Sequence, residues 1–357
     1  MNKKDLHLTA FTGGKELPSS RFRIRQHIPN LASNNIFIND YCPLINQHSR
    51  LPGTLGDINL RYLPPVAAAQ IILNSILRLP GTLRSYKDDF VWIERNFVPN
   101  FDSLVCLTKG PRILDIDDSI WMSSRFAQSS CIKMARKIDA VIAGNDFIAN
   151  WYSQYCKKIY TIPTAVNSEI FLPKVHDLNN SNFVIGWTGT SSNFSYLYII
   201  ERSLHLFVKD YPHTRLLILA DKMPKFNLIP EKNIIYIQWN ENIEASVLDH
   251  IDVGIMPLID NDWTKGKCSF KMLQYMAKEI PVLVSSVGHN LEVLKNGNCG
   301  YGIKNNEDWY EYLKDLYLSP DKRKTMGIIG REIIKDIYDT KVISNQLKNV
   351  FQSFNYS

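Results

Sequence analysis

The segment from residue 252 to 284 constrains the fold more than any other, because its apolar and polar stretches alternate in a fixed order. Its apolar runs, 253–258 and 280–284, are short and continuous, as is typical of strands buried in a parallel sheet. A polar loop rich in Asp, Asn and Gly separates the first run from a helical pattern that ends near Lys278. Ser269 is expected to cap that helix. The order strand, loop, helix, strand predicts an α/β fold.

Two lysines, Lys267 and Lys271, flank the start of this helix. A helix N-terminus carries about half a positive charge, so a cation placed there costs roughly 0.3–1 kcal/mol. Two lysines together with free backbone N–H groups make a site that lacks only an anion. We therefore predict a cradle for a phosphate or diphosphate, with Gln274 one turn deeper and Phe270 on the core-like face of the helix. The alternative is two solvated lysines beside a loop.

The residues around these lysines resemble those of a known family. The run GKCSFKMLQYMA at 266–277, followed by PVLV at 281–284, resembles the donor-binding segment of retaining GT-B glycosyltransferases of the family-4 type, the glycosyl transferases of group 1. The better-known branch of that family has a glutamate pair here, whose positions correspond to Gly266 and Gln274. Gln274 can still hydrogen-bond a ribose hydroxyl as donor and acceptor, but it supplies no charge.

The resemblance is strongest over residues 183–305, which open with a predicted strand at 183–189. The polar residues after this strand offer hydroxyl and N–H groups at the mouth of a helix expected to run to about Asp210. Many family members place an arginine and a lysine there, and none occurs between residues 186 and 200, so we infer that the two lysines above supply that charge. The donor-binding residues predicted in this half are Thr188, Gly189, Thr190, Ser191, Lys267, Phe270, Lys271, Gln274, Gly288 and Asn290.

The first half opens with a predicted strand at 6–11, a turn at Gly13 and Gly14, and a helix at 18–28. A glycine turn between strand and helix brings N–H groups close to whatever binds above the sheet. This turn resembles the glycine loop of the GT-B N-domain, so both glycines are donor-binding candidates. The expected helix cap is Ser19 or Ser20. We expect at least two of three helix arginines to be solvated rather than bound to an anion: Arg21, Arg23 and Arg25.

Three carboxylates, Asp115, Asp117 and Asp118, end a predicted strand that begins at Arg112. Ligands of open α/β sheets bind beyond the carboxyl ends of strands, so such acids could bind a metal, act as a base or accept hydrogen bonds from sugar hydroxyls. A His-Asp pair stands at this strand end in many family members, and the resemblance places Asp117 and Asp118 at its positions. Both are predicted as catalytic, with no metal site. The alternative is that Asp118 and Ser119 cap the next helix.

Charge limits the partners. Residues 1–170 hold 20 Lys+Arg and 14 Asp+Glu, whereas residues 171–357 hold 21 of each, so the net charge of +6 lies in the first half. A basic half favours an acidic partner. No nucleic-acid motif is present, and the family resemblance implies an anionic membrane surface or a lipid-diphosphate acceptor instead. The alternative is that the basic half merely aids solubility. An apolar helix expected at 65–79 could lie on a membrane or pack in a core.

Other features point to the compartment. The six cysteines form no C-x-x-C pair, which suits a reducing cytoplasm. The apolar stretch after the N-terminal lysines is too short for a signal peptide, and no run approaches the ~20 apolar residues of a membrane span. We therefore expect a cytoplasmic protein, with peripheral contact to the inner face of the cell membrane left open.

The expected architecture is GT-B: two Rossmann-like parallel-sheet domains facing a cleft. Residues 1–170 would bind the acceptor, residues 182–335 the nucleotide sugar, and a helix in 336–357 would pack back on the first domain. The family implies transfer of a sugar to a glycan or lipid-linked acceptor with retention, without metal or cofactor, in O-antigen, capsule or exopolysaccharide synthesis. The alternatives are a non-catalytic nucleotide-sugar-binding partner in a polysaccharide assembly complex and a GT-B-fold sugar epimerase.

Overall fold

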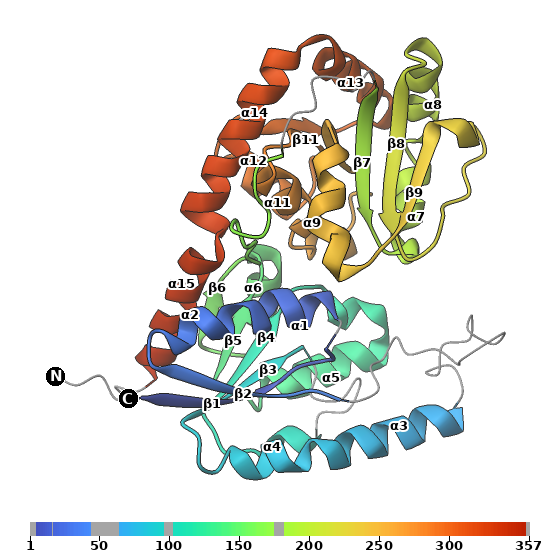
Figure 1. The fold of residues 1–357 in the computed structure, drawn as a ribbon. Coiled ribbons are helices and arrows are strands. Elements are labelled where there is room, and N and C mark those ends of the chain that lie inside the picture. The colour runs from blue at the N-terminus through green and yellow to red at the C-terminus, as the bar shows by residue number, and fades with distance from the viewer. Residues whose placement is uncertain (1–4, 16, 44–63, 96–102, 175–181, 355–357) are drawn as a thin grey trace. The chain divides into compact units, whose positions relative to one another are not determined.

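The computed structural model describes residues 5–15, 17–43, 64–95, 103–174 and 182–354 (Figure 1). The chain forms two compact units, of which the first comprises residues 1–164 and 340–357 and the second residues 165–339. Each unit is built on its own six-stranded sheet. The predicted α/β class, with two parallel-sheet domains, is therefore confirmed.

The sheet of the N-terminal unit has the strand order β2-β1-β3-β4-β5-β6, and all neighbouring strands are parallel. The chain adds β2 on one side of β1 and then builds outward on the other side, so the order reverses between β1 and β3. Such a switch point leaves a crevice at the carboxyl ends of the strands, where ligands of open sheets bind. The strands are β1 (Leu6–Phe11), β2 (Ile36–Tyr41), β3 (Phe90–Glu94), β4 (Arg112–Ile116), β5 (Ala140–Ala143) and β6 (Ile159–Thr161).

The last helix of the chain belongs to this first unit. Its Phe351 ring lies 5.1 Å from the Trp92 ring of β3, and its Ser344 Oγ lies 2.8 Å from Nδ1 of His27. The predicted return of the C-terminal helix to the N-terminal unit is therefore observed. The helices of this unit are α1 (Pro18–Arg23), α2 (Ile28–Ala32), α3 (Pro64–Leu77), α4 (Leu79–Arg84), α5 (Arg125–Ala135), α6 (Asp146–Tyr152) and α15 (Thr340–Ser353).

The sheet of the C-terminal unit has the order β12-β11-β10-β7-β8-β9, again all parallel, and its switch point lies between β7 and β10. Its strands are β7 (Phe183–Gly189), β8 (Thr214–Ala220), β9 (Ile234–Gln238), β10 (Val253–Met256), β11 (Val282–Ser285) and β12 (Gly300–Ile303). Its helices are α7 (Phe194–Tyr198), α8 (Glu201–Asp210), α9 (Glu244–Val247), α10 (Asp262–Lys265), α11 (Phe270–Ala277), α12 (His289–Leu294), α13 (Trp309–Leu318) and α14 (Pro320–Ile333).

This second sheet is buried on both faces, which explains its continuous apolar strands. Val184 of β7 and Leu217 of β8 belong to one core cluster, which α11 completes through Leu273. Their neighbours Ile185 and Leu216 point the other way, into a second cluster with residues of α8 and α13. The alternation of strand side chains thus fixes the helix layers on each side of the sheet.

Two expected helix caps and the length of one expected helix were wrong in detail. Ser269 stands at the N-cap position of α11, but its φ of 54° is left-handed and its side chain makes no cap hydrogen bond. The N-cap of α1 is Leu17, and Ser20 bonds to Glu94 instead. The helix expected to run to Asp210 is broken into a 3-10 turn at Ser191–Asn193, then α7 and α8.

The apolar helix expected at 65–79 is α3, which ends at Leu77, and Pro80 and Gly81 lie in the first turn of α4 instead of ending the pattern. Among the described residues, no helix is both long and apolar enough to cross a bilayer. The expected linker at 178–182 lies outside the described residues, except for its last residue.

Candidate functional site

In the C-terminal unit, Tyr275 fixes α11 against the switch point between β7 and β10. The side chain is fully buried, and its hydroxyl accepts a hydrogen bond of 2.9 Å from the backbone N–H of Thr188. Its ring packs on Gly254 of β10, where an added Cβ would stand 2.3 Å from the ring. Burial raises the pKa of Tyr275, so the phenol stays protonated. The second half of α11 is thereby held against β10 and the carboxyl end of β7.

Lys271 lies directly against that strand end. Its Nζ is 5.3 Å from the centre of the Trp187 ring, and an added Cβ at Gly189 would stand 2.6 Å from its Cε. Gly189 therefore leaves the space that the lysine stem occupies. Lys267 is also half-buried, with Nζ 5.9 Å from the rings of both Tyr196 and Trp263. Aromatic faces attract ammonium groups at these distances.

The expected role of Ser191 as an open phosphate receptor needs revision. Asp221, which follows β8, accepts hydrogen bonds from the Ser191 N–H at 2.5 Å and from its hydroxyl at 2.8 Å. A carboxylate thus already stands at this turn. Thr190 is exposed, and its Oγ1 lies 2.8 Å from Ser192 Oγ. Of the predicted residues at the end of β7 and after it, Gly189 lies against Lys271 and Thr188 bonds to Tyr275, while Ser191 bonds to Asp221.

Gln274 is buried, and its amide donates a 2.9 Å hydrogen bond to Oε1 of Glu244. The same oxygen accepts from the Trp239 ring N–H at 3.3 Å. Glu244 on α9 is itself buried, so its carboxylate depends on these donors. A carboxylate therefore stands beside the glutamine, although the α11 sequence carries none. Phe270, one turn earlier, packs against the core cluster that contains Leu273.

Gly288 and Asn290 begin α12 at the carboxyl end of β11. Gly288 has a φ of 51°, and an added Cβ would stand 2.8 Å from the backbone of Lys265. Only glycine accommodates that backbone shape and that approach. Asn290 is fully buried and donates to the Ser285 carbonyl at 3.0 Å. These residues hold the β11–α12 turn against the loop that carries Lys267.

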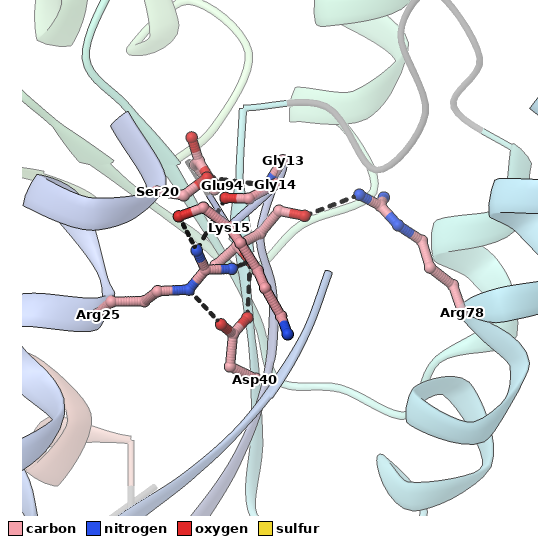
Figure 2. Close-up of polar contacts among 9 residues, drawn as sticks. Gly13, Gly14, Lys15, Ser20, Arg25, Asp40, Arg78 and Glu94 are labelled. Atoms are coloured by element: carbon pink, nitrogen blue, oxygen red, sulfur yellow. Dashed lines mark hydrogen bonds and ion pairs between the residues drawn. The ribbon is translucent and has the colours of Figure 1, made fainter. Parts of the chain in front are cut away.

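In the N-terminal unit, the backbone of the glycine turn is held by side chains of neighbouring elements (Figure 2). The Gly13 N–H donates to Glu94 Oε2 at 2.8 Å and lies 3.1 Å from Ser20 Oγ. The Gly14 carbonyl accepts a 2.8 Å hydrogen bond from Arg25, whose Nε also pairs with Asp40 at 2.6 Å. The Gly13 N–H thus bonds to a buried carboxylate at the end of β3. In this structure the N–H group points to the protein's own side chains.

The expectation that two of the three helix arginines are solvated was wrong. Arg23 is buried and pairs with Asp115 at 2.6 Å, and it also donates to the Ile162 carbonyl at 2.9 Å. Trp92 donates to the second Asp115 oxygen at 3.3 Å. Arg25 is paired as described above. Desolvation raises the pKa of Asp115 to about 6 even with Arg23 beside it.

The remaining two acids of the strand end differ from each other. Asp117 accepts a 2.7 Å hydrogen bond from Arg95, and although burial acts to raise its pKa, the Arg95 charge outweighs burial and lowers it. Asp118 accepts from the Ser119 N–H at 3.1 Å, next to a 3-10 turn at Ile120–Ser123. Among the described residues, no group of three or more His, Cys, Asp or Glu side chains could hold a metal ion.

Comparison with known proteins identifies the second unit. Residues 182–319 match the family model of the glycosyl transferases group 1. The chain therefore carries a group 1 glycosyltransferase domain. The capsular polysaccharide biosynthesis glycosyltransferase CapM of Staphylococcus aureus is 22% identical to the chain over 191 residues. That match covers 51% of this chain and 49% of CapM, so it spans about half the length of this curated relative.

Solved structures share the fold of the whole chain. Sucrose-phosphate synthase from Thermosynechococcus elongatus matches with a TM-score of 0.72 and 14% identity, covering 99% of this chain and 100% of that one. HepE from Anabaena, solved in complex with UDP-glucose, matches with a TM-score of 0.69 and 12% identity, covering 98% and 100%. The two six-stranded sheets, one of them within the group 1 domain, thus belong to a GT-B fold.

Sequence reasoning missed two carboxylates of the group 1 domain. Asp221 follows β8 directly, so the rule applied to the end of β7 would have found it if applied to the next strand. Glu244 stands 30 positions before Gln274 on a separate short helix, and no local pattern points to it. In the N-terminal unit, Glu94 and Arg95 were also missed, because no local pattern links them to Gly13 and Asp117, the residues to which they bond.

Replacing Tyr275 with phenylalanine is expected to cost about 1–3 kcal/mol of unfolding free energy, because the buried Thr188 N–H loses its acceptor while the ring packing on Gly254 is kept. Urea unfolding measures the change. The matched control is Tyr198→Phe, whose exposed hydroxyl accepts from the Lys225 N–H, and it should cost less than about 0.5 kcal/mol. Equal effects of the two substitutions would show that the Tyr275 hydroxyl does not hold α11.

Proposed function

We propose that the protein transfers a sugar from a nucleotide-sugar donor to a glycan or lipid-linked acceptor, with retention at the anomeric carbon, in the synthesis of a cell-surface polysaccharide. The group 1 domain supports the reaction class. The CapM relative supports the polysaccharide setting, and the HepE complex supports a nucleotide-sugar donor. Retention and independence of a metal ion are what the family resemblance implies.

The observation that supports the proposal most is that Lys271 lies against the carboxyl end of β7, a strand of the switch point in the second sheet. Lys267, four residues earlier, has its Nζ 5.9 Å from the rings of Tyr196 and Trp263. The leaving group of such a reaction is a nucleoside diphosphate, which gains charge as the glycosidic bond breaks. Ammonium groups fixed before the reaction stabilise that charge without a reorganisation cost. Lys271 has its stem against Gly189 and its ammonium over the Trp187 ring, and it therefore suits this task better than a solvated lysine.

The C-terminal unit would hold the rest of the donor near these lysines. Gln274 and Glu244 form a polar pair one turn deeper along α11, where the two ribose hydroxyls of a nucleotide would find both donors and acceptors. The ring of Trp239 lies next to the same carboxylate and would line the base. We also assign a donor role to the backbone at Thr188 and Gly189, and keep Gly288 and Asn290 as the supports of the neighbouring turn.

In the N-terminal unit, Asp117 is the proposed catalytic carboxylate. Arg95 keeps its pKa low, so at neutral pH it accepts hydrogen bonds and cannot act as a general acid. Its chemistry fits the orientation of a sugar or acceptor hydroxyl. Asp118 is half-buried beside it and would share that role, while Asp115 is occupied by Arg23. Gly13 and Gly14 would line this region with the backbone of their turn, which is hydrogen-bonded to Glu94.

Thermal unfolding with a panel of nucleoside diphosphates and their sugars tests the proposal. A ligand at 100 times its Kd stabilises the folded state by about 2.7 kcal/mol, which raises Tm by about 5–10 °C in a unit of this size. We expect one nucleobase to give this shift, and its sugar to be transferred to a lipid-linked extract. No shift with any nucleotide would contradict the proposal. A sugar altered without acceptor would identify an epimerase, and binding without transfer a non-catalytic partner.

A further inference from the structure

The helices α3 and α4 of the N-terminal unit carry an apolar stripe that faces away from the protein. Its residues recur at spacings of four, three, four and three, which places them on one side of a helix. Each is between 46% and 71% exposed. They form what we call the α3–α4 apolar face: Ile72, Ile76, Leu79 and Leu83 on the helices, and Tyr86 in the turn just after α4.

The two helices form a nearly continuous helical segment, so the spacing of the apolar residues holds across their junction. Arg78 between them has helical dihedral angles, and its N–H donates to the Asn74 carbonyl at 3.2 Å. The N–H of Thr82 in turn donates to the Arg78 carbonyl at 2.9 Å. At 1.5 Å per residue, the stripe from residue 72 to 86 is about 21 Å long. Figure 1 shows both helices in succession along the outside of the first unit.

The opposite side of α4 is the one that packs on the protein. Gly81 abuts Phe11 and Tyr41, since an added Cβ would stand 2.8 Å and 2.7 Å from their rings. Arg78 is buried and donates to the Thr12 carbonyl at 3.1 Å. The side of this helix with small and polar residues therefore packs against the core, while its large aliphatic side chains remain exposed. That inversion distinguishes the stripe from an ordinary amphipathic helix packed on a core.

The charges around the face are positive where they are exposed. Lys87 follows α4, and the Lys109 N–H donates to Ser85 Oγ, which places Lys109 and the exposed Leu107 beside the end of α4. The acids of the same region face inward: Asp88 accepts from Thr9 at 2.7 Å and Asp89 from the His7 N–H at 2.9 Å. The sequence of α3, Pro64–Leu77, contains no charged residue.

We propose that the α3–α4 apolar face docks on an anionic lipid bilayer, with Lys87 and Lys109 at the level of the phosphate headgroups. An aliphatic stripe with flanking cations is what binds a bilayer surface, because hydrophobic insertion and attraction to anionic lipid then act together. Tyr86 at the end of the stripe has the apolar ring and polar tip favoured at that boundary. The excess of positive charge in residues 1–170 acts in the same direction. The face deepens the proposed function, because it would bring the enzyme to a lipid-linked acceptor.

Sedimentation with vesicles of phosphatidylcholine containing about 30% phosphatidylglycerol tests the proposal, without any nucleotide sugar, so the outcome is independent of transferase activity. The double variant Ile76→Ser, Leu83→Ser should lower vesicle binding about tenfold. Its matched control is Leu206→Ser, Leu318→Ser, which removes two similarly exposed leucines from α8 and α13 and should bind as the unaltered protein does. Unchanged melting curves verify that both variants are folded.

The double variant Lys87→Gln, Lys109→Gln separates the electrostatic contribution. It should bind phosphatidylglycerol vesicles about 25-fold more weakly, with little change on pure phosphatidylcholine. Binding that neither pair of substitutions on this face reduces would overturn the proposal. So would a concentration-dependent dimer that Ile76→Ser, Leu83→Ser dissolves, because the face would then be covered by a second copy of the chain.

Discussion

Replacing Lys271 with methionine is expected to lower kcat/KM for sugar transfer about 10²–10³-fold, a loss of about 2.7–4 kcal/mol of transition-state stabilisation. Methionine keeps an unbranched apolar side chain against Gly189, so the change removes the charge over the Trp187 ring and little of the packing. The proposed diphosphate leaving group would then develop its charge beside one lysine instead of two. Initial-rate kinetics with saturating acceptor measure the effect.

The matched control is Lys265→Met in the neighbouring helix α10. Its ammonium is exposed and pairs with Asp262 at 3.2 Å, so its removal should change transfer less than about twofold. Binding of the nucleoside diphosphate product should weaken in Lys271→Met and stay the same in Lys265→Met. Full transfer activity in a folded Lys271→Met protein would remove this lysine from the phosphate site.

The parts of this site that could be predicted are those encoded by local patterns. The apolar runs of β10 and β11 and the helical spacing of α11 are visible in about thirty consecutive residues, because burial on both faces of a parallel sheet demands them. The observed α11, Phe270–Ala277, begins one residue after the predicted cap. Placing Lys271 beside the end of β7 required only that ligands bind where strand order reverses.

The parts that could not be predicted are pairings between distant residues. Glu94 meets Gly13 across 81 positions, and Arg23 meets Asp115 across 92. The sequence around an arginine near a glycine turn looks the same whether its side chain faces solvent or a buried acid. Sequence reasoning therefore favours the commoner, solvated state. Ser20 shows the same limit: its position suits a helix cap, but a buried carboxylate is the stronger partner.

Replacing Arg23 with methionine is expected to destabilise the N-terminal unit by about 3–5 kcal/mol at pH 8, because a buried carboxylate loses its charged partner. Hydrogen exchange of the β3 and β4 amides during urea unfolding measures the change in this unit. The control Arg84→Met removes an arginine that is partly exposed while paired with Asp88, and it should cost about 1 kcal/mol or less.

The pH dependence of the Arg23→Met variant separates loss of the ion pair from loss of packing. In the unaltered protein the pKa of Asp115 is about 6 against 3.8 for the free group, so the native state binds the proton more tightly and this group's contribution to stability falls as pH rises from about 4 to 6. Without Arg23 the pKa rises further, and the decline continues above pH 6. The cost of Arg23→Met should therefore be smaller at pH 5 than at pH 8. Adding Asp115→Asn, which keeps an acceptor for Trp92, should recover most of the loss and flatten the pH dependence, whereas a cost that is equal at both pH values would assign it to packing.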